Sequence, residues 1–441
     1  MGVAFGTDGI RGVANVELTA DVAAALGRAA AVVLGRGTWL IGADTRASSP
    51  VLVAALAGGL AAAGADVIDL GVLPTPGVAF HAQVRGCPAA VVSASHNPWT
   101  DNGIKLLAEG GRKLTDALEE AVAENMTAAP PPSSARSGRV TRDDDAVTPY
   151  VGHLVDALEG RRLEGLVVVV DCANGAASEA APRALRGVGA DVIVLADQPD
   201  GTNINDHCGS THPEALREAV VAAGADAGLA LDGDADRVVA VSADGVVVDG
   251  DHILAISAMD LRGRGRLRGD RVAITVMSNL GLRQALAASG IGVVETPVGD
   301  RYVLEAMERD DLALGGEQSG HVIFRDLATT GDGVLTGLLL LDAVVRAGRP
   351  LAALSQAAMT RLPQVLRNVR ITDRGALTAA PGVVVAVAEA EAELAGTGRV
   401  LLRPSGTEPL VRVMVEAPTE GQATAIAERL CAAVREAMGA G

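Results

Sequence analysis

The stretch Gly64-Ala65-Asp66-Val67-Ile68 returns letter for letter as Gly189-Ala190-Asp191-Val192-Ile193. In both places a glycine leads into β-branched residues, which is typical of a strand. A strand-like run and an Ala-rich helical segment precede each copy, and a further helical segment and another strand-like run follow it. Strands that alternate with helices predict α/β layers with largely parallel sheets.

The same order of elements occurs a third time, so we predict three tandem domains of one fold. After about Pro363 the order changes, which predicts a separate and smaller domain. The expected fold class is α/β, with three tandem similar α/β domains of mixed, largely parallel sheets and a smaller C-terminal α+β domain around one central cleft. The predicted domains are residues 1–147, 148–248, 249–363 and 364–441. The predicted α/β strands are Trp39–Asp44, Gly64–Leu70 and Ala89–Ser93, then Leu166–Asp171, Gly189–Val194 and Ala227–Leu231, then Arg271–Val276, Gly290–Val294 and Leu312–Leu314.

The composition excludes several classes of partner. The chain has 441 residues, a net charge of −17 and only three Phe, two Trp and two Tyr. It therefore lacks the basic stripe and the stacking aromatics of a nucleic-acid binder, and its acidity disfavours an anionic membrane surface. No stretch is apolar for long enough to span a membrane, and no basic region followed by an apolar run suggests a signal peptide. Four scattered cysteines without a C-x-x-C pair fit reduced thiols, so we expect a cytoplasmic protein.

The third predicted strand of each α/β domain ends in a loop with its own chemistry. These loops are Ser93–Pro98, Asp232–Arg237 and Gly316–His321. In open α/β sheets, ligands bind beyond the carboxyl ends of the strands. Three equivalent positions with three unlike chemistries therefore predict one shared site, with Ser95 at the tip of its strand.

Asp232, Asp234 and Asp236 alternate along the chain, so an extended backbone places their carboxylates on one side. Three like charges repel each other unless a cation neutralises them, and oxygen ligands favour a hard ion, Mg²⁺ before Ca²⁺ or Mn²⁺. An EF-hand is excluded because Arg237 replaces the required glycine and Ala243 the required glutamate. A solvated acidic turn is the alternative, but the apolar residues on both sides disfavour it.

The segment Arg403-Pro404-Ser405-Gly406-Thr407-Glu408-Pro409 lies between two predicted strands of the last domain. Small residues let successive N–H groups line an anion nest, and Arg403 adds a bidentate donor. We interpret the segment as a phosphate clamp, with an ordinary hairpin loop as the alternative. The chain has no G-x-x-x-x-G-K-[ST] motif, so the clamp is not a nucleotide P-loop.

Five further side chains are candidates for the same site. Arg11 lies in a glycine-rich segment that we expect to be a tight loop. It could contact an anion there, or it could be a solvated residue of a turn. Lys105 and Lys113 are the only lysines among 37 basic residues, so a lysine in place of arginine hints at a specific need for an ammonium group. Lys105 follows a turn just beyond Ser95 and could face the same site. We ascribe the occurrence of lysine at position 113 to chance. Glu317, Ser319 and His321 offer an acceptor, a hydroxyl and an imidazole, although a lone histidine is usually structural. Together these groups predict phosphoryl transfer on a sugar phosphate.

Four ordered motifs, Ser-Ala-Ser-His-Asn-Pro, Asp-Gly-Asp-Ala-Asp-Arg, Gly-Glu-Gln-Ser-Gly-His and Arg-Pro-Ser-Gly-Thr-Glu-Pro, resemble those of the α-D-phosphohexomutase family over the whole chain. Four further features resemble the bacterial phosphoglucosamine mutase branch: Gln318, the stretch from Asn203 to His212, Gly299-Asp300-Arg301-Tyr302 and Asp101-Asn102-Gly103-Ile104-Lys105. The resemblance implies that glucosamine 6-phosphate and glucosamine 1-phosphate interconvert through a phosphoserine at Ser95 and a 1,6-bisphosphate, for UDP-N-acetylglucosamine and cell-wall synthesis.

The resemblance also implies roles for individual residues. Ser95 would carry the phosphoryl group, and Arg11, Lys105 and His321 would handle protons and charge beside it. Mg²⁺ would be held by Asp232, Asp234, Asp236 and a phosphate oxygen on Ser95. The implied substrate-binding residues are Arg237, Glu317, Ser319, Arg403, Ser405, Gly406, Thr407 and Arg412.

Other functions stay open. Phosphomannomutases and phosphoglucomutases share every general motif. A strand that runs into Asp232-x-Asp234 also resembles a haloacid-dehalogenase-type phosphatase, although Asp236 lies where that family prefers Thr or Val. A non-catalytic sugar-phosphate-binding protein would need neither the aspartates nor Ser95. The expected partner is a small amino-sugar phosphate, and the sequence leaves a homodimer open.

Overall fold

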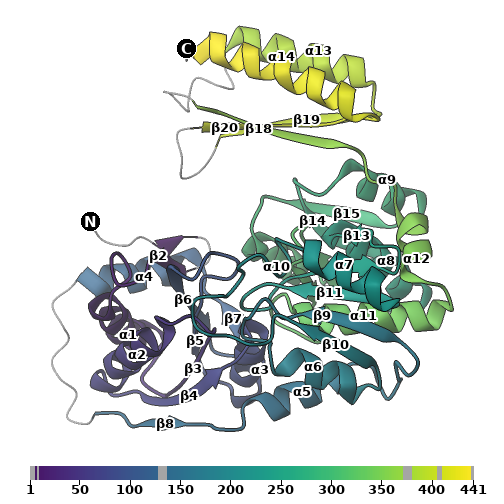
Figure 1. Cartoon of the computed structure of the whole chain (residues 1–441). Helices are drawn as coiled ribbons and strands as arrows, with labels where there is room; N and C mark the ends of the chain where they lie inside the picture. Colours follow the sequence, from purple (N-terminus) through teal and green to yellow (C-terminus); the bar gives the residue numbers. More distant parts are fainter. Residues whose placement is uncertain (1–4, 7–8, 128–136, 371–379, 405–409, 439–441) are drawn as a thin grey trace. The chain divides into compact units, whose positions relative to one another are not determined.

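The computed structural model describes residues 5–6, 9–127, 137–370, 380–404 and 410–438 (Figure 1). The chain divides into two compact units. The first contains Met1–Met277 and Gly290–Ala358, and the second contains Ser278–Ser289 and Met359–Gly441. The finer boundaries at residues 147, 248 and 363 stay a prediction.

The three predicted α/β domains are confirmed by one sheet order that occurs three times. The strands run β4-β3-β5-β6 in the first domain, β10-β9-β11-β12 in the second and β15-β14-β16-β17 in the third. In each, the first three strands are parallel and the fourth is antiparallel. The mixed, largely parallel sheets thus agree with the prediction, and the antiparallel fourth strand turns the chain back just after each distinctive loop.

The first domain extends this core to eight strands in the order β1-β2-β6-β5-β3-β4-β8, with β7 beside β6. Helices α1 and α2 cross so closely that a Cβ on Gly27 would lie 2.4 Å from Leu56 O, which only glycine permits. The elements are β1 (Phe5–Gly6), β2 (Gly9–Val13), α1 (Ala20–Leu34), β3 (Thr38–Ala43), α2 (Ser49–Ala62), β4 (Asp66–Val72), α3 (Thr75–Arg85), β5 (Ala89–Val92), β6 (Asp101–Ala108), β7 (Arg112–Lys113), α4 (Asp116–Thr127) and β8 (Val140–Arg142).

The second and third domains complete the first compact unit, apart from α9. The second has α5 (Val147–Asp156), β9 (Val167–Asp171), α6 (Ala180–Gly187), β10 (Asp191–Leu195), α7 (Glu214–Ala223), β11 (Ala227–Leu231), β12 (Val238–Ser242) and β13 (Val247–Val248). The third has α8 (Gly250–Gly263), a 3₁₀ turn (Arg268–Asp270), β14 (Arg271–Thr275), β15 (Gly292–Thr296), α10 (Asp300–Arg309), β16 (Leu314–Gly316), β17 (Val322–Phe324), α11 (Gly333–Ala347) and α12 (Leu351–Ala358).

A shared turn shows how closely the repeat is kept. At the end of β3, β9 and β14, the second strands in the three sheet orders, a side-chain oxygen accepts from the backbone N–H two residues later. Asp44 accepts at 3.1 Å, Asp171 at 2.9 Å and Thr275 at 3.3 Å. Such turns stop a strand without a glycine and leave the following side chains at the carboxyl edge of the sheet.

The second compact unit is a three-stranded antiparallel sheet, β18-β20-β19, with α13 and α14 on one face (Figure 1). Buried Glu416 accepts from Arg399 Nε at 2.6 Å and from Leu280 N, at the start of α9, at 3.0 Å. The carboxylate thereby satisfies free N–H groups at a helix N-terminus. The elements are α9 (Leu280–Ala288), β18 (Gln364–Arg370), α13 (Pro381–Leu394), β19 (Arg399–Pro404), β20 (Leu410–Glu416) and α14 (Glu420–Met438).

Two local expectations differ from the structure. The glycine-rich opening segment contains strands β1 and β2 instead of only a tight loop, because β2 adds to the sheet edge through backbone pairing with β6. Strands β4, β10, β15 and β16 each begin two residues after the predicted starts at Gly64, Gly189, Gly290 and Leu312.

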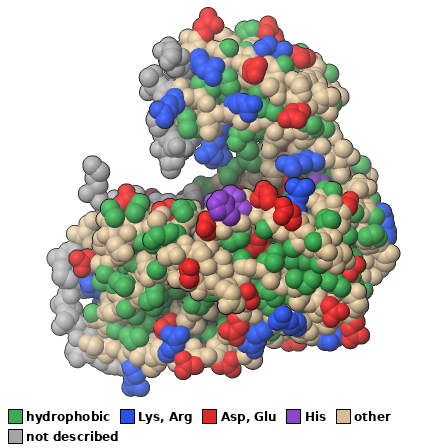
Figure 2. Space-filling model, in the orientation of Figure 1, with side chains coloured by type: hydrophobic (Ala, Val, Ile, Leu, Met, Phe, Trp, Pro, Cys, Tyr) green, Lys and Arg blue, Asp and Glu red, His purple; other side chains and the backbone are tan. Residues whose placement is uncertain are grey.

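No helix in the described part of the chain is long and apolar enough to cross a membrane. On the face shown in Figure 2, acidic and basic side chains are interspersed among apolar ones.

Candidate active site

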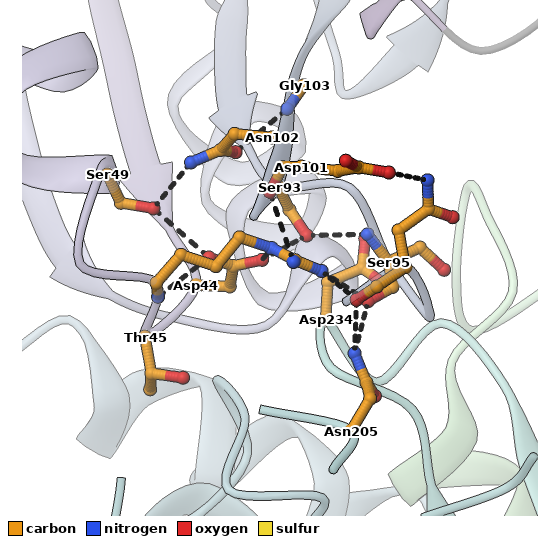
Figure 3. Close-up of polar contacts among 12 residues, drawn as sticks. Asp44, Thr45, Ser49, Ser93, Ser95, Asp101, Asn102, Gly103, Asn205 and Asp234 are labelled. Atoms are coloured by element: carbon orange, nitrogen blue, oxygen red, sulfur yellow. Dashed lines mark hydrogen bonds and ion pairs between the residues drawn. The ribbon is translucent and has the colours of Figure 1, made fainter. Parts of the chain in front are cut away.

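The loop after β5 presents Ser95 in a constrained backbone. Ser95 is buried and has a φ of 52°, in the left-handed region that few non-glycine residues adopt. Its N–H donates to Ser93 Oγ at 2.9 Å, and Ser93 Oγ donates to Asp44 Oδ2 at 2.6 Å (Figure 3). The hydroxyl of Ser95 donates to Asp232 Oδ2, in the second domain, at 2.5 Å. The structure thus brings together the first two of the three predicted loops.

The aspartate triplet forms a buried cluster whose ligand oxygens lie within 4.8 Å of one another. Asp234 Oδ1 and Asp236 Oδ1 are buried and have no hydrogen-bond partner among the described residues. Buried acceptors normally find donors, so two unsatisfied carboxylate oxygens in one cluster indicate a place for a cation. The all-oxygen donor set fits a hard divalent ion.

The pKa values of two aspartates in the triplet are shifted in opposite directions. Burial, reinforced by the charges of Asp236 and Asp234, raises the pKa of Asp232 well above its usual range. Burial acts in the same direction on Asp236, but Lys105, His321 and Arg237 outweigh it and hold the pKa of Asp236 well below its usual range. The cations near the cluster therefore stabilise its charge unevenly.

Lys105 reaches the triplet from β6. Its Nζ lies 2.9 Å from Asp234 Oδ2 and 3.3 Å from Asp236 Oδ2, with both sides of the ion pair buried. Thr75 Oγ1 also donates to Asp234 Oδ2, at 2.6 Å. The predicted placement of Lys105 in the site agrees with this geometry. Lys113, which we ascribed to chance, forms an ion pair with Asp300 of the third domain.

His321 joins the third domain to the same cluster. Its buried ring places Nδ1 3.7 Å from Asp236 Oδ2, and Nε2 accepts from Gly331 N at 3.1 Å. In the neutral ring, a nitrogen that accepts carries no proton, so this contact leaves the proton on Nδ1, toward Asp236. Burial opposes the charged ring, but the hydrogen bond and the charge of Asp236 raise the pKa of His321.

The two candidate arginines of the first unit lie near the serine loop. Arg237 N donates to Asp232 Oδ1 at 3.2 Å, and its Nε lies 3.6 Å from Asp236 Oδ1. Arg11 lies in β2 opposite Gly103 of β6. Burial, followed by the charges of Arg237 and Arg11, lowers the pKa of His96 to about 4. His96 is therefore neutral at physiological pH, beside two guanidinium groups.

The two other candidates in the Gly316–His321 loop are more exposed than His321. Glu317 is half-buried, and its Oε1 accepts from Gly299 N at 3.1 Å. Ser319 is exposed. The loop thus leaves a carboxylate and a hydroxyl available for polar recognition.

Arg403 and Arg412 belong to the second compact unit. They face each other directly in the register of β19 and β20. Like charges at opposed positions destabilise a sheet, which an anion bound between them would relieve. Ser405, Gly406 and Thr407 lie outside the described residues.

Sequence reasoning missed three residues that contact the predicted ones: Thr75, Arg46 and Asn205. Arg46 contacts the backbone of the serine loop, and Asn205 Nδ2 donates to Ser95 O at 2.9 Å. The signal for Arg46 was its place just after the predicted strand Trp39–Asp44, where ligands gather in such sheets. No pattern in the sequence pointed to Asn205 or Thr75 except through the family resemblance of the stretch that contains Asn205.

A serine hydroxyl at a buried carboxylate triplet, with an ammonium group among the carboxylates, is an arrangement suited to enzymes that transfer phosphoryl groups. Comparisons with known proteins narrow this class. Profiles described as phosphoglucomutase/phosphomannomutase alpha/beta/alpha domains I, II and III match residues 2–131, 148–245 and 249–362, and the C-terminal domain profile matches residues 366–433. The chain belongs to the phosphoglucomutase/phosphomannomutase family, the phosphohexomutases, and is an enzyme.

Similar proteins include curated phosphoglucosamine mutases. That of Thermobifida fusca is 54% identical over 98% of both chains, and that of Rhodococcus opacus is 52% identical over 98% of this chain and 99% of the relative. A solved phosphoglucomutase/phosphomannomutase family protein from Burkholderia thailandensis has a TM-score of 0.82 and 27% identity, covering 99% of this chain and 98% of the other. Aspergillus fumigatus N-acetylphosphoglucosamine mutase, with a TM-score of 0.74, 19% identity and coverage of 99% and 95%, supports the fold alone.

Proposed function

We propose that the chain is a phosphoglucosamine mutase that interconverts glucosamine 6-phosphate and glucosamine 1-phosphate. The relatives of that name, 52–54% identical over nearly the whole chain, support the substrate. The observation that carries the chemistry is the 2.5 Å contact between Ser95 Oγ and Asp232 Oδ2. It places a serine hydroxyl, the carrier we propose, against the carboxylates best suited to a divalent cation.

In the proposed reaction, the Oγ–P bond of phosphorylated Ser95 breaks as a bond from phosphorus to O1 of glucosamine 6-phosphate forms. The sugar bisphosphate then reorients in the site so that its 6-phosphate faces Ser95. Its O6–P bond breaks as the Oγ–P bond of Ser95 forms again. The proton lost from O1 returns to O6, so each cycle restores the enzyme. The buried site excludes water that would otherwise accept the phosphoryl group.

We propose Mg²⁺ as the cation held by Asp232, Asp234, Asp236 and a phosphate oxygen on Ser95. When bound, it would neutralise charge on the transferring phosphoryl group. Lys105, already 2.9 Å from Asp234, supplies a second positive charge beside the same group. We assign proton and charge handling near the reacting hydroxyl to Lys105, Arg11 and the Nδ1 proton of His321.

We propose that the substrate is held at both ends. Glu317 and Ser319 would bind sugar hydroxyls, and Arg237 would contact the substrate beside the metal loop. In the second compact unit, the opposed pair Arg403 and Arg412 would bind the phosphate that does not react. Ser405, Gly406 and Thr407 would complete that clamp.

The deciding test is substrate preference. We expect kcat/KM for glucosamine 1-phosphate to exceed that for glucose 1-phosphate and mannose 1-phosphate, and a higher value for either rival would overturn the assignment. Labelling with a sugar bisphosphate separates the carriers, because phosphoserine survives acid and an aspartyl phosphate at Asp232 does not. Buried free thiols at Cys87, Cys172, Cys208 and Cys431 support the cytoplasmic location that we also propose.

A further inference from the structure

Arg46 lies just after β3, and its side chain is completely buried. Its Nε donates to Asp44 Oδ2 at 2.8 Å. Its two Nη atoms donate to four backbone carbonyl oxygens in the chain from Ser95, in the loop after β5, to Asp101, the first residue of β6. These belong to Ser95 and Asn97, each at 2.9 Å, to Asp101 at 3.1 Å and to Pro98. A guanidinium has five N–H bonds, so every one of them has an acceptor here.

The four carbonyls explain why the loop needs this cation. Backbone carbonyls that converge in a buried space repel one another and lose their hydrogen bonds to water. The guanidinium satisfies all four, and Asp44 balances its charge. Arg46 is therefore the centre around which the chain from Ser95 to Asp101 is folded.

The same contacts fix the backbone on both sides of Ser95. Its carbonyl accepts from Arg46 Nη2 at 2.9 Å. It also accepts from Asn205 Nδ2 at 2.9 Å (Figure 3). Its N–H donates to Ser93 Oγ, which is itself bonded to Asp44. The left-handed φ of 52° is unfavourable for serine and persists only because these neighbours determine it. With the peptide held, the hydroxyl meets Asp232 in the second domain.

We propose that Arg46, balanced by Asp44, is a positioning residue for the phosphoryl-carrying serine. Arg46 touches neither substrate nor the reacting atoms. It holds the Ser95 backbone so that Oγ returns to the same place at the carboxylate triplet after each transfer. Asn205 secures the same carbonyl from the second domain. This inference rests on the proposed function of Ser95 as the phosphoryl carrier.

A loosened loop has two consequences for the chemistry. Transfer to the sugar slows, because an error of about 1 Å in the placement of a reacting atom costs roughly 10²-fold in rate. Phosphoserine also becomes open to water, whose oxygen attacks phosphorus as the Oγ–P bond breaks, leaving serine and inorganic phosphate. A residue that only stabilised the fold would change neither value per folded molecule.

The test compares Arg46→Lys with Arg161→Lys. Arg46→Lys keeps the charge beside Asp44 but has only three donors for five acceptors. Arg161, which pairs with Asp342 away from this loop, is the matched control for the same exchange. For Arg46→Lys we expect a kcat about 100-fold lower, a KM within about threefold of wild type, and faster release of inorganic phosphate from phosphoserine. Amide hydrogen exchange in residues 93–101 should also quicken.

Equal kcat, phosphoserine lifetime and exchange in Arg46→Lys and Arg161→Lys would overturn the proposal. If Arg46→Lys does not fold, Asn205→Ala decides, because it removes donors to the carbonyls of Ser95 and Asn97 without touching the buried ion pair. The proposed function fails separately, if wild-type enzyme carries no phosphoryl group on Ser95. The exchange measurement still reports on Arg46 in that case.

Discussion

Ser95 Oγ lies 2.5 Å from Asp232 Oδ2, although 137 positions separate the two residues in the chain. The contact joins the first α/β domain to the second at the carboxyl ends of equivalent strands, β5 and β11. Burial and the two neighbouring aspartates raise the pKa of Asp232 well above its usual range. The serine therefore meets a carboxylate whose charge needs compensation, and this leads to predictions about metal and charge.

Asp232→Asn should weaken metal binding while preserving the fold. The amide oxygen still accepts from Ser95, and one of three repelling charges is removed. For wild-type protein, Mg²⁺ at 100 times its dissociation constant raises the free energy of unfolding by about 2.7 kcal/mol. We expect thermal scans in EDTA and in Mg²⁺ to show this difference in wild type and little of it in Asp232→Asn. Equal stabilisation of both proteins by Mg²⁺ would contradict the assignment of this site.

Lys105→Met should destabilise the metal-free protein far more than the Mg²⁺-loaded protein. Loss of one partner from a buried ion pair leaves uncompensated charge and costs about 3–5 kcal/mol. Here Asp234 and Asp236 would lose their ammonium partner, which a bound divalent ion partly replaces. Urea unfolding in EDTA and in Mg²⁺ measures the two costs.

The chain provides a matched control in Lys113, its other lysine, which pairs with Asp300. We expect Lys113→Met to destabilise the protein equally with and without Mg²⁺. A cost of Lys105→Met that did not depend on Mg²⁺ would show that the ammonium and the metal do not act on the same carboxylates.

The sequence predicted the sheets and the three loops because apolar runs that end in polar residues carry local information. Asp232, Ser95 and Lys105 were all expected in one site on that basis. Arg46 and Asn205 were not, because they bind backbone carbonyls, and a position after a strand or in a family-like stretch does not show which carbonyls a side chain will meet. The glycine-rich start was expected as a loop because its pairing with β6 depends on a distant segment.

Gly233→Ala should impair catalysis through the same serine loop. A Cβ on Gly233 would lie 2.6 Å from Ser95 O, so one of the two loops must shift. Forced shifts in packed regions cost about 1–3 kcal/mol, and a displaced Ser95 should lower kcat about 10²-fold. Gly152→Ala is the control, because nothing lies within 4 Å of the added carbon in α5. There we expect unchanged kcat and a stability gain of up to about 1 kcal/mol; equal kcat in both variants would refute the argument.

Arg412→Thr should weaken substrate binding without loss of stability. Directly opposed arginines repel in the free protein, so removal of one relieves strain between β19 and β20. A charge-assisted hydrogen bond contributes about 1.5–3 kcal/mol, which corresponds to a KM roughly 10–150 times higher. Steady-state kinetics with glucosamine 6-phosphate and thermal unfolding test both halves. An unchanged KM would remove Arg412 from the proposed phosphate clamp.

Asp332 should make the stability of the first compact unit depend on pH. This buried residue caps the N-terminus of α11: its Oδ1 accepts from Leu335 N at 2.9 Å, and its Oδ2 accepts from Tyr150 Oη at 2.9 Å. Burial raises the pKa of Asp332 from 3.8 to about 6, and the hydrogen bonds offset only part of that effect. Between these values the unfolded chain loses the proton while the folded protein keeps it, so stability falls as pH rises from about 4 to 6. The expected loss is about 3 kcal/mol.

Asp332→Asn isolates this dependence, because asparagine has no proton to lose and remains a good helix cap. We measure the unfolding free energy of the variant minus that of wild type, with urea in EDTA. We expect this difference to rise by about 3 kcal/mol between pH 4 and 6 and to stay constant above pH 6. Asp145→Asn, at an exposed position, controls for the loss of one charge. A constant difference between Asp332→Asn and wild type across pH 4 to 6 would mean that Asp332 titrates alike in the folded and unfolded chains.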